Sequence, residues 1–411
     1  MEPYIYRCLD NGLHTALLPV KSNVVYCGFA IRSGSSHDPI ELPGLAHFVE
    51  HTIFKGTQRR KSWHIINRME VVGGELNAYT TKDTTFVYTA APKRELARSV
   101  ELLNDLIRHA TFPDTELEKE KGVVADEINS YKDTPSELIY DHFEELFFEG
   151  HPLAHPILGD TESLARMTSE DCRAYVRRAF APQRMLFFCM GQISELRFEK
   201  VTSTFLSEPF VQSGEEIQLP APTIRHFSLR KATDTYQAHT LIGGIAPSLQ
   251  EADRTEAGLL LNILAGSGMN SRLNVRLREK EGWVYNVESS YAAIPSAGWW
   301  QIYFGSDPEH AGVALEQTLA EVERLCRVPL TPTALRAWKK QAKGQAIMAT
   351  EQGESLFLNF GRQLLLKGKY EGLKGLTDRI DSVTTEHLQE VAVKLFDLQP
   401  ISQLIYLGKS V

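Results

Sequence analysis

GLAHFVEHTIF, residues Gly44 to Phe54, is the most informative stretch of this sequence. It contains the pattern His-x-x-Glu-His, formed by His47, Glu50 and His51. In a helix, residues four apart lie one turn apart on the same face, as two ligands of one metal ion must. The apolar residues between them predict a helix packed inside the fold, where two imidazoles without partners would be costly. The stretch therefore predicts a site for a metal such as Zn²⁺, with Glu50 beside it.

The alternative for this stretch is a chance pattern in a structural helix, because a short motif in a long chain is a weak signal by itself. A third ligand elsewhere in the sequence would favour the metal site. Residues 112–117 have the features of a helix start, and the helix runs through Glu120 and Glu127. These two glutamates are seven positions apart and share a helix face, whereas Asp126 points about 100° away from Glu127. Each acid also has the ordinary alternative of a solvated surface carboxylate.

The composition is that of a globular protein with more than one domain. The chain has 411 residues, of which 43% are hydrophobic and 23% charged, and this length exceeds one ordinary core. A net charge of −8 argues against a general nucleic-acid binder, and no apolar run is long enough to span a membrane. The five cysteines form no Cys-x-x-Cys pair, and the amino terminus has no basic stretch followed by an apolar core. These features predict a cytoplasmic protein.

The first half of the sequence predicts a series of strands and helices. The turn at residues 10–12 predicts a hairpin of 4–9 with 14–20, and the strand 24–32 is apolar on both faces and therefore central. Periodicity and capping residues predict further elements in chain order: a helix at 62–72, strands near 75–81 and 84–90, a helix from Pro92 to about His109, a helix capped by Thr168, and a strand at 185–190.

The second half repeats the order of elements in the first. It predicts a strand near 238–243, helices at 256–265 and 271–281, two strands, and then further helices. Residues 114–117 resemble residues 332–335, and without gaps Glu120 meets Trp338 and Glu127 meets Gln345. No His-x-x-Glu-His occurs in the second half. We therefore predict two copies of one fold, residues 1–208 and 223–411, joined by a linker at 209–222.

Together these motifs resemble those of the M16 family of metallopeptidases, which includes pitrilysin, insulin-degrading enzyme and mitochondrial processing peptidase. The resemblance covers nearly the whole chain and is to the short, two-domain processing-peptidase branch. In the first half it rests on the inverted zincin motif, on GGELNAYT at residues 73–80, and on Glu120 and Glu127, the latter 76 positions after His51. In the second half it rests on residues 271–273 and 277–285, where Arg278 and Tyr285 are seven apart.

The resemblance implies an α+β fold, with two homologous α/β-roll domains that each have an antiparallel-rich sheet flanked by helices. It implies His47, His51 and Glu127 as ligands of Zn²⁺, and Glu50 as the general base on a zinc-bound water. Glu120 would orient one of the two histidines. Three protein ligands leave a fourth position for water, which is the arrangement of a catalytic zinc.

The resemblance also assigns contacts to a peptide substrate. One segment resembles the family's edge strand, to which an extended peptide adds as a further strand, namely Asn77, Ala78, Tyr79 and Thr80. Arg278 and Tyr285 resemble residues that meet the substrate near the scissile bond, where Tyr285 would donate to the oxyanion. The alternatives are an ordinary sheet edge, a surface arginine and a half-buried tyrosine.

The length of the chain leads to an expectation about assembly. Long family members enclose a chamber with four such domains, and the Arg/Tyr pair comes from the half opposite the zinc. This chain supplies two domains, so we expect a homodimer in which Arg278 and Tyr285 act in trans, while a hetero-partner stays open. The long glycine-rich loop of the non-catalytic processing-peptidase subunit is absent, since Gly266-Ser267-Gly268 is only a short remnant.

The expected function is a zinc endopeptidase that acts on peptides or on unfolded, presequence-like segments inside a chamber. The alternative, from another class, is a non-catalytic relative that serves as a scaffold or assembly subunit. Within the first class, the sequence does not distinguish removal of targeting presequences from general peptide clearance.

Overall fold

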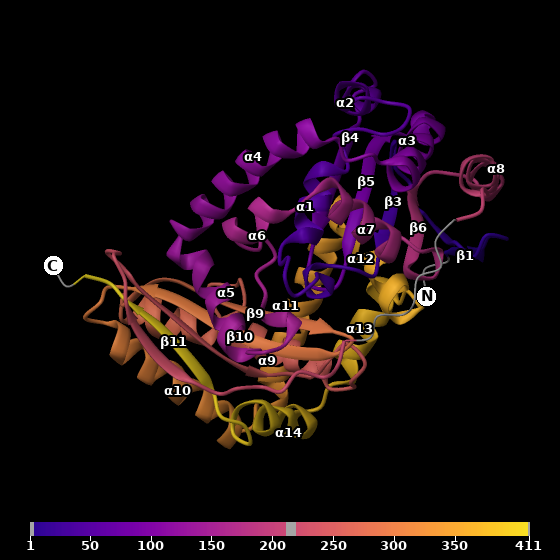
Figure 1. Ribbon diagram of the computed structural model, residues 1–411. Helices are drawn as coiled ribbons and strands as arrows, with labels where there is room; N and C mark the ends of the chain where they lie inside the picture. Colours follow the sequence, from indigo (N-terminus) through magenta and orange to yellow (C-terminus); the bar gives the residue numbers. More distant parts are fainter. Residues whose placement is uncertain (1–3, 211–218, 410–411) are drawn as a thin grey trace. The chain divides into compact units, whose positions relative to one another are not determined.

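The computed structural model describes residues 4–210 and 219–409 (Figure 1). Contacts divide the chain into two compact units. The first consists of Met1–Ser130, His155–Leu219 and Thr350–Gly372, and the second of Tyr131–Ala154, Pro220–Ala349 and Leu373–Val411. Each unit therefore contains a segment from the other half of the sequence, which the linear division into 1–208 and 223–411 did not include. Of the expected linker at 209–222, residues 211–218 lie outside the described residues.

The first unit is built on a six-stranded sheet in the order β1-β2-β6-β3-β5-β4. Its strands are β1 (Ile5–Cys8), β2 (His14–Pro19), β3 (Val24–Ile31), β4 (Glu75–Thr80), β5 (Thr85–Pro92) and β6 (Met185–Gly191). All neighbours are antiparallel except β2 and β6. The predicted hairpin is confirmed, and β3 lies between β6 and β5 as its apolar sequence predicted.

Helices cover both faces of this sheet. The helices of this unit are α1 (Leu45–Thr52), α2 (Ser62–Glu70), α3 (Leu96–His109), α4 (Asp114–Lys132), α6 (Thr161–Arg166), α7 (Ser169–Ala179), α8 (Glu195–Leu206) and α12 (Gly353–Lys367), and of these α1, α2, α3, α8 and α12 contact the strands. Phe187 packs against Phe198 of α8, while the ring of Phe188 stacks on Phe357 of α12 with centroids 4.2 Å apart. Successive residues of a strand point to opposite faces, so α8 and α12 cover different sides.

The predicted start of the third helix was wrong. Pro92 ends β5, where it pairs with Val24, and α3 begins only at Leu96 after a short 3-10 turn at Lys93–Glu95. Proline lacks a backbone N–H, so it fits the end of a strand as well as the start of a helix. The helix capped by Thr168 is confirmed, because the Thr168 side chain accepts a hydrogen bond from the backbone N–H of Asp171.

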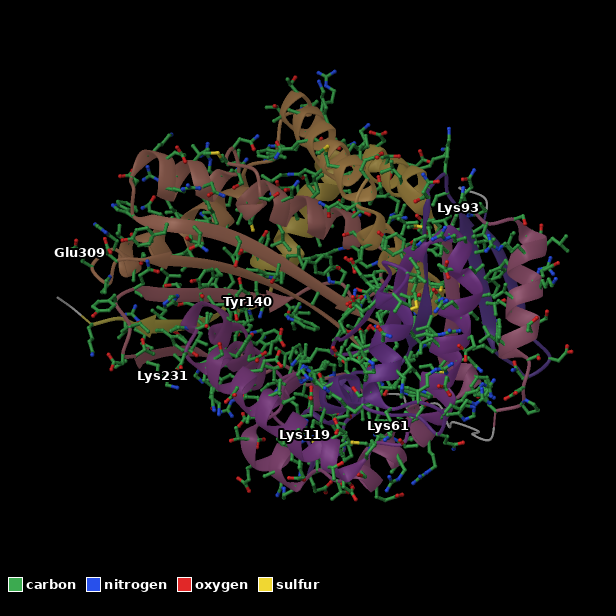
Figure 2. The ribbon with its side chains drawn as sticks, turned by 90° about the horizontal axis from the view of Figure 1, so that it is seen from above. Lys61, Lys93, Lys119, Tyr140, Lys231 and Glu309 are labelled. Carbon is green, nitrogen blue, oxygen red and sulfur yellow. The ribbon has the colours of Figure 1, made fainter. Side chains whose placement is uncertain are left out.

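The second unit has a five-stranded sheet in the order β7-β11-β8-β10-β9. Its strands are β7 (Ser228–Ala232), β8 (Ala238–Ile245), β9 (Val284–Ile294), β10 (Ala297–Ser306) and β11 (Ser402–Leu407). Its helices are α5 (Pro135–Phe147), α9 (Arg254–Ala265), α10 (Ala311–Arg327), α11 (Pro332–Thr350), α13 (Gly372–Ser382) and α14 (Thr385–Phe396). Helix α5 contacts β8 and β11, and its Tyr140, labelled in Figure 2, donates a hydrogen bond to Glu288 of β9 at 2.9 Å.

The two units repeat each other locally. Helices α4 and α11 each have 19 residues and begin at positions 114 and 332, which is the offset that the ungapped sequence match used. The helix predicted at 271–281 is instead a π-helix over Asn274–Lys280. In the described part of the chain, no helix combines the length and the apolar character needed to cross a bilayer.

Candidate metal centre

Helix α1 starts at a point that is fixed by backbone contacts. The Asp38 carboxylate accepts hydrogen bonds from the backbone N–H groups of Gly44 and Ala46, both at 2.8 Å, and so caps the helix. Gly44 has φ +89°, and a Cβ there would lie 2.6 Å from the carbonyl oxygen of Leu158. Only glycine fits such a position without strain. The start of α1 is therefore held in place, and with it the register of His47 and His51.

His47, His51 and Glu127, which the resemblance implied as metal ligands, lie together in the structure. The three potential ligand atoms all lie within 4.8 Å of one another. Glu127 Oε2 of α4 is 3.8 Å from His47 Nε2 and 3.4 Å from His51 Nε2. Bonds of about 2.0–2.2 Å at tetrahedral angles put zinc ligands about 3.4 Å apart, so two imidazoles and one carboxylate at these distances fit a zinc ion.

Burial keeps His47 in the form that a metal ligand requires. Its side chain is buried, and burial, helped by the neighbouring His51, lowers the pKa of His47 to about 3. The imidazole is therefore neutral at neutral pH. In the described part of the chain its Nδ1 has no hydrogen-bond partner. A buried polar atom without a partner is costly, and the other ring nitrogen, Nε2, is the one that faces Glu127.

Glu120 contacts His51. The resemblance implied that Glu120 orients one of the two histidines but did not indicate which one. Its Oε1 is 3.0 Å from His51 Nδ1, and its Oε2 is 2.6 Å from Lys55 Nζ. When His51 Nδ1 donates to this carboxylate, Nε2 is left with its lone pair directed at the cluster. The sequence analysis missed Lys55, which lies four residues after His51; that spacing is a signal that could have identified it.

Replacing Lys55 by methionine is expected to weaken zinc binding about 10–100-fold, because Glu120 would lose its cation and hold His51 less firmly. Competitive titration against a fluorescent chelator measures this affinity. The matched control is Lys119→Met, because Lys119 also lies on the first unit (labelled in Figure 2) and its side chain is 71% exposed. Equal zinc affinities in both variants would contradict a role for Lys55.

Glu50 lies beside the cluster but is not part of it. Burial raises the pKa of its carboxyl, with a smaller contribution from Glu127, while hydrogen bonds from Thr80 and the charge of His51 oppose the rise. Its Oε2 is buried and has no hydrogen-bond partner among the described residues. A carboxyl with a raised pKa that faces a polar cluster is suited to accept and return a proton.

The expected substrate strand lies at an edge of its sheet. Strand β4 pairs with β5 and, among the described strands, has no neighbour on its other side. Helix α1 contacts β4, and Thr80 at its end reaches Glu50. The outer edge of this strand, which no other described strand covers, therefore lies next to the candidate metal centre.

Arg278 and Tyr285 belong to the second unit, whereas the candidate metal centre belongs to the first. The Arg278 side chain is 45% exposed, and its Nε lies 4.0 Å from Glu279. Tyr285 is 54% exposed, and its hydroxyl donates to Asp307 Oδ1 at 2.8 Å. That hydrogen bond raises the pKa of Tyr285, which keeps the hydroxyl protonated. The sequence analysis did not identify Asp307.

Comparisons with known proteins agree with this architecture. The family profile described as insulinase (peptidase family M16) matches residues 18–161, and the profile described as peptidase M16 inactive domain matches residues 166–342. An uncharacterized zinc protease, YmxG of Bacillus subtilis, is 30% identical and the match covers 95% of both chains. The mitochondrial-processing peptidase subunit beta of Bos taurus is 27% identical over 96% of this chain and 82% of its own.

Solved structures show the same fold. A protease from Helicobacter pylori superposes with a TM-score of 0.91 at 20% identity and full coverage of both chains, 100% each. A peptidase M16 inactive domain from Pseudomonas fluorescens also gives a TM-score of 0.91, at 18% identity, with 99% of this chain and 98% of that chain covered. The expected α+β fold with two sheets flanked by helices is thus confirmed.

Proposed function

The chain belongs to the M16 family of peptidases, and from this premise we propose that it is a zinc-dependent endopeptidase. The observation that carries the proposal is the convergence of His47, His51 and Glu127, with Glu50 on the same helix as the two histidines. The substrates would be peptides or unfolded, presequence-like segments. Five free cysteines, all in the described part of the chain, support the cytoplasm as the place of action.

In the proposed reaction, His47, His51 and Glu127 would hold the zinc, and Lys55 and Glu120 would keep His51 oriented. Zinc in such a site lowers the pKa of water and polarises a carbonyl. Glu50 takes a proton from the attacking water and later passes it to the leaving amine. Its raised pKa keeps the cost of this proton transfer low.

The free edge of β4 would position the substrate. An extended peptide that pairs with Asn77, Ala78, Tyr79 and Thr80 would pass beside α1, which contacts this strand. Main-chain hydrogen bonds supply the affinity in such strand addition, so the sequence of the peptide matters little. Such binding would favour unfolded segments, because only they can present a free backbone.

We propose that the active protein is a homodimer in which Arg278 and Tyr285 of one copy serve the zinc site of the other. Tyr285 would exchange its hydrogen bond to Asp307 for one to the developing oxyanion, and Arg278 would hold the substrate backbone. The support is that His47, His51 and Glu127 lie in one unit and the Arg/Tyr pair in the other. A different M16-like chain in place of the second copy is the competing assembly.

Mixing Glu50→Gln and Tyr285→Phe protomers, each nearly inactive alone, is expected to restore roughly a quarter of wild-type activity, because half of the dimers are mixed and one of their two sites is intact. Light scattering gives the mass of the assembly, and a quenched peptide gives the rate. Mixing Glu50→Gln with Glu127→Ala protomers is the control, since both lesions lie at the same site. A monomer in solution, or no recovery despite proven subunit exchange, would contradict action in trans.

The proposed function itself is tested by removing the metal. The purified protein is expected to contain about one zinc per chain, to lose cleavage of a quenched peptide in a chelator, and to regain it with added zinc. Elemental analysis measures the zinc content, and initial rates measure the loss and recovery of peptide cleavage. A chain that binds no zinc and cleaves no peptide would instead be a non-catalytic assembly subunit. Mass spectrometry of products from a mixed peptide pool would distinguish presequence removal from general peptide clearance.

A further inference from the structure

The two residues of the second unit that are proposed to meet the substrate lie at irregular points of the backbone. Arg278 lies in the π-helix Asn274–Lys280, and Tyr285 follows a turn at Gly282, whose φ is +67°. π-helical turns and β-bulges occur frequently at functional sites, where they change the direction of single side chains. The local backbone therefore supports a functional role for this pair.

Tyr285 is the extra residue of a β-bulge. Val284 and Asn286 of β9 lie opposite successive residues of β10, so among the described residues Tyr285 has no partner in that strand. Val284 and Val287 are buried in the same core cluster, although residues three apart in a regular strand point to opposite faces. The bulge resolves this conflict, and it leaves Tyr285 and Asn286 both exposed.

Asp307 holds the hydroxyl group that the bulge presents. It follows β10 directly, and its Oδ1 accepts a hydrogen bond from the Tyr285 hydroxyl at 2.8 Å. A tyrosine hydroxyl has a single proton and therefore donates only one hydrogen bond at a time. While this proton points at Asp307, Tyr285 cannot donate to a substrate, so the tyrosine is restrained in this structure.

The surroundings of Asp307 allow this hydrogen bond to break at low cost. The Asp307 side chain is 51% exposed, so water can replace the tyrosine hydroxyl, and His310 Nδ1 lies 3.9 Å from Asp307 Oδ2. This ring nitrogen is buried and has no hydrogen-bond partner among the described residues, and the imidazole stacks on Trp283. A small shift would let His310 donate to the carboxylate once Tyr285 has left.

We propose that Asp307 is a latch on Tyr285: it engages the tyrosine hydroxyl in the resting protein, and a substrate can use this hydroxyl only after the hydrogen bond to Asp307 has broken. The latch presupposes the proposed role of Tyr285 and adds a restraining residue to it. Asp307 does not touch the substrate and acts only through Tyr285. Because the net contribution of one hydrogen bond is small, the latch should lower the rate by only about 2–10-fold.

Removing the latch is expected to make the enzyme faster. Asp307→Ala should raise kcat/KM for a quenched peptide about 2–10-fold over the wild type. Asp307→Asn should raise it less, because the amide oxygen still accepts a hydrogen bond but carries no charge. Glu309→Gln, an exposed acid of the same turn (labelled in Figure 2), is the matched control and should leave the rate unchanged. Circular dichroism verifies the fold of each variant.

A titration without peptide cleavage separates the latch from the proposed function. The hydrogen bond to Asp307, and then the negative charge of Asp307, raise the pKa of Tyr285. The absorbance of ionised tyrosine, taken as the difference between each protein and its Tyr285→Phe counterpart, follows this one hydroxyl as the pH rises. In Asp307→Ala, the pKa of Tyr285 should fall toward the ordinary value of about 10.

The activity measurement and the titration can each overturn the latch. It is wrong if Asp307→Ala lowers kcat/KM or leaves it unchanged, if the gain in rate persists in a Tyr285→Phe background, or if the pKa of Tyr285 does not change. A wild-type protein that cleaves no peptide would instead contradict the proposed function, and the titration would then decide alone whether Asp307 holds the tyrosine hydroxyl.

Discussion

Replacing Glu50 by glutamine is expected to lower kcat for peptide cleavage about 10²–10⁴-fold while the zinc content stays at the wild-type level. Glutamine keeps the shape of the side chain and the contact with Thr80, but it cannot accept a proton from water. Because Glu50 lies beside the cluster of His47, His51 and Glu127 and is not part of it, the metal should remain bound. Initial rates with a quenched peptide and elemental analysis of the same sample measure the two quantities.

The control for this variant is Glu70→Gln, an exposed glutamate at the end of α2. It carries the same chemical change outside the candidate metal centre, and its rate should equal that of the wild type. If the Glu50 variant kept more than about a tenth of the activity, general-base catalysis by this residue would be ruled out, since such catalysis contributes at least a hundredfold.

Replacing Glu127 by alanine is expected to weaken zinc binding by more than about 100-fold, a larger loss than that produced by residues outside the ligand set. The two imidazoles of α1 would remain, but the only negatively charged ligand of the cluster would be gone. Cleavage should then be undetectable at equimolar zinc and return partly at high zinc. Competitive chelator titration and activity as a function of zinc concentration measure these changes.

Asp126→Ala is the matched control for Glu127→Ala. Asp126 is the neighbouring acid on α4 and is also exposed, but it points about 100° away around the helix. The Glu127 side chain is 45% exposed, so neither substitution should change the thermal unfolding temperature much. Similar zinc affinities for the two variants would remove Glu127 from the ligand set.

The grouping of the candidate ligands could be expected in part from local signals, whereas Glu127 as the third residue was implied by the family resemblance. The spacing of His47 and His51 fixes a shared helix face, and the spacing of Glu120 and Glu127 does the same on α4. Which acid meets which histidine depends on how α4 packs against α1, and sequence periodicity does not contain that information. The contact of Thr80 with Glu50 was missed for the same reason, since it joins elements that are distant in the sequence.

Element boundaries were harder to predict where a residue is compatible with two kinds of secondary structure. Pro92 is compatible with a strand end and with a helix start, and pairing with Val24 decided in favour of the strand. The partners of helices α5 and α12 were not predictable either. Periodicity shows that a helix has a buried face, but not which sheet that face will cover.

Helix α5 comes from the first half of the sequence but packs on the second sheet, and α12 comes from the second half but packs on the first sheet. This arrangement limits where the chain can be divided. Gly243 of β8 lies so close to α5 that a Cβ there would be 2.7 Å from the ring of Phe143, and Phe188 of β6 rests on Phe357 of α12. If the gene were split between the two halves, each polypeptide would lack the helix that covers one side of its sheet. Aromatic side chains of that sheet would then be exposed to water. Such fragments should be insoluble when produced singly and recover only when synthesised together in one cell.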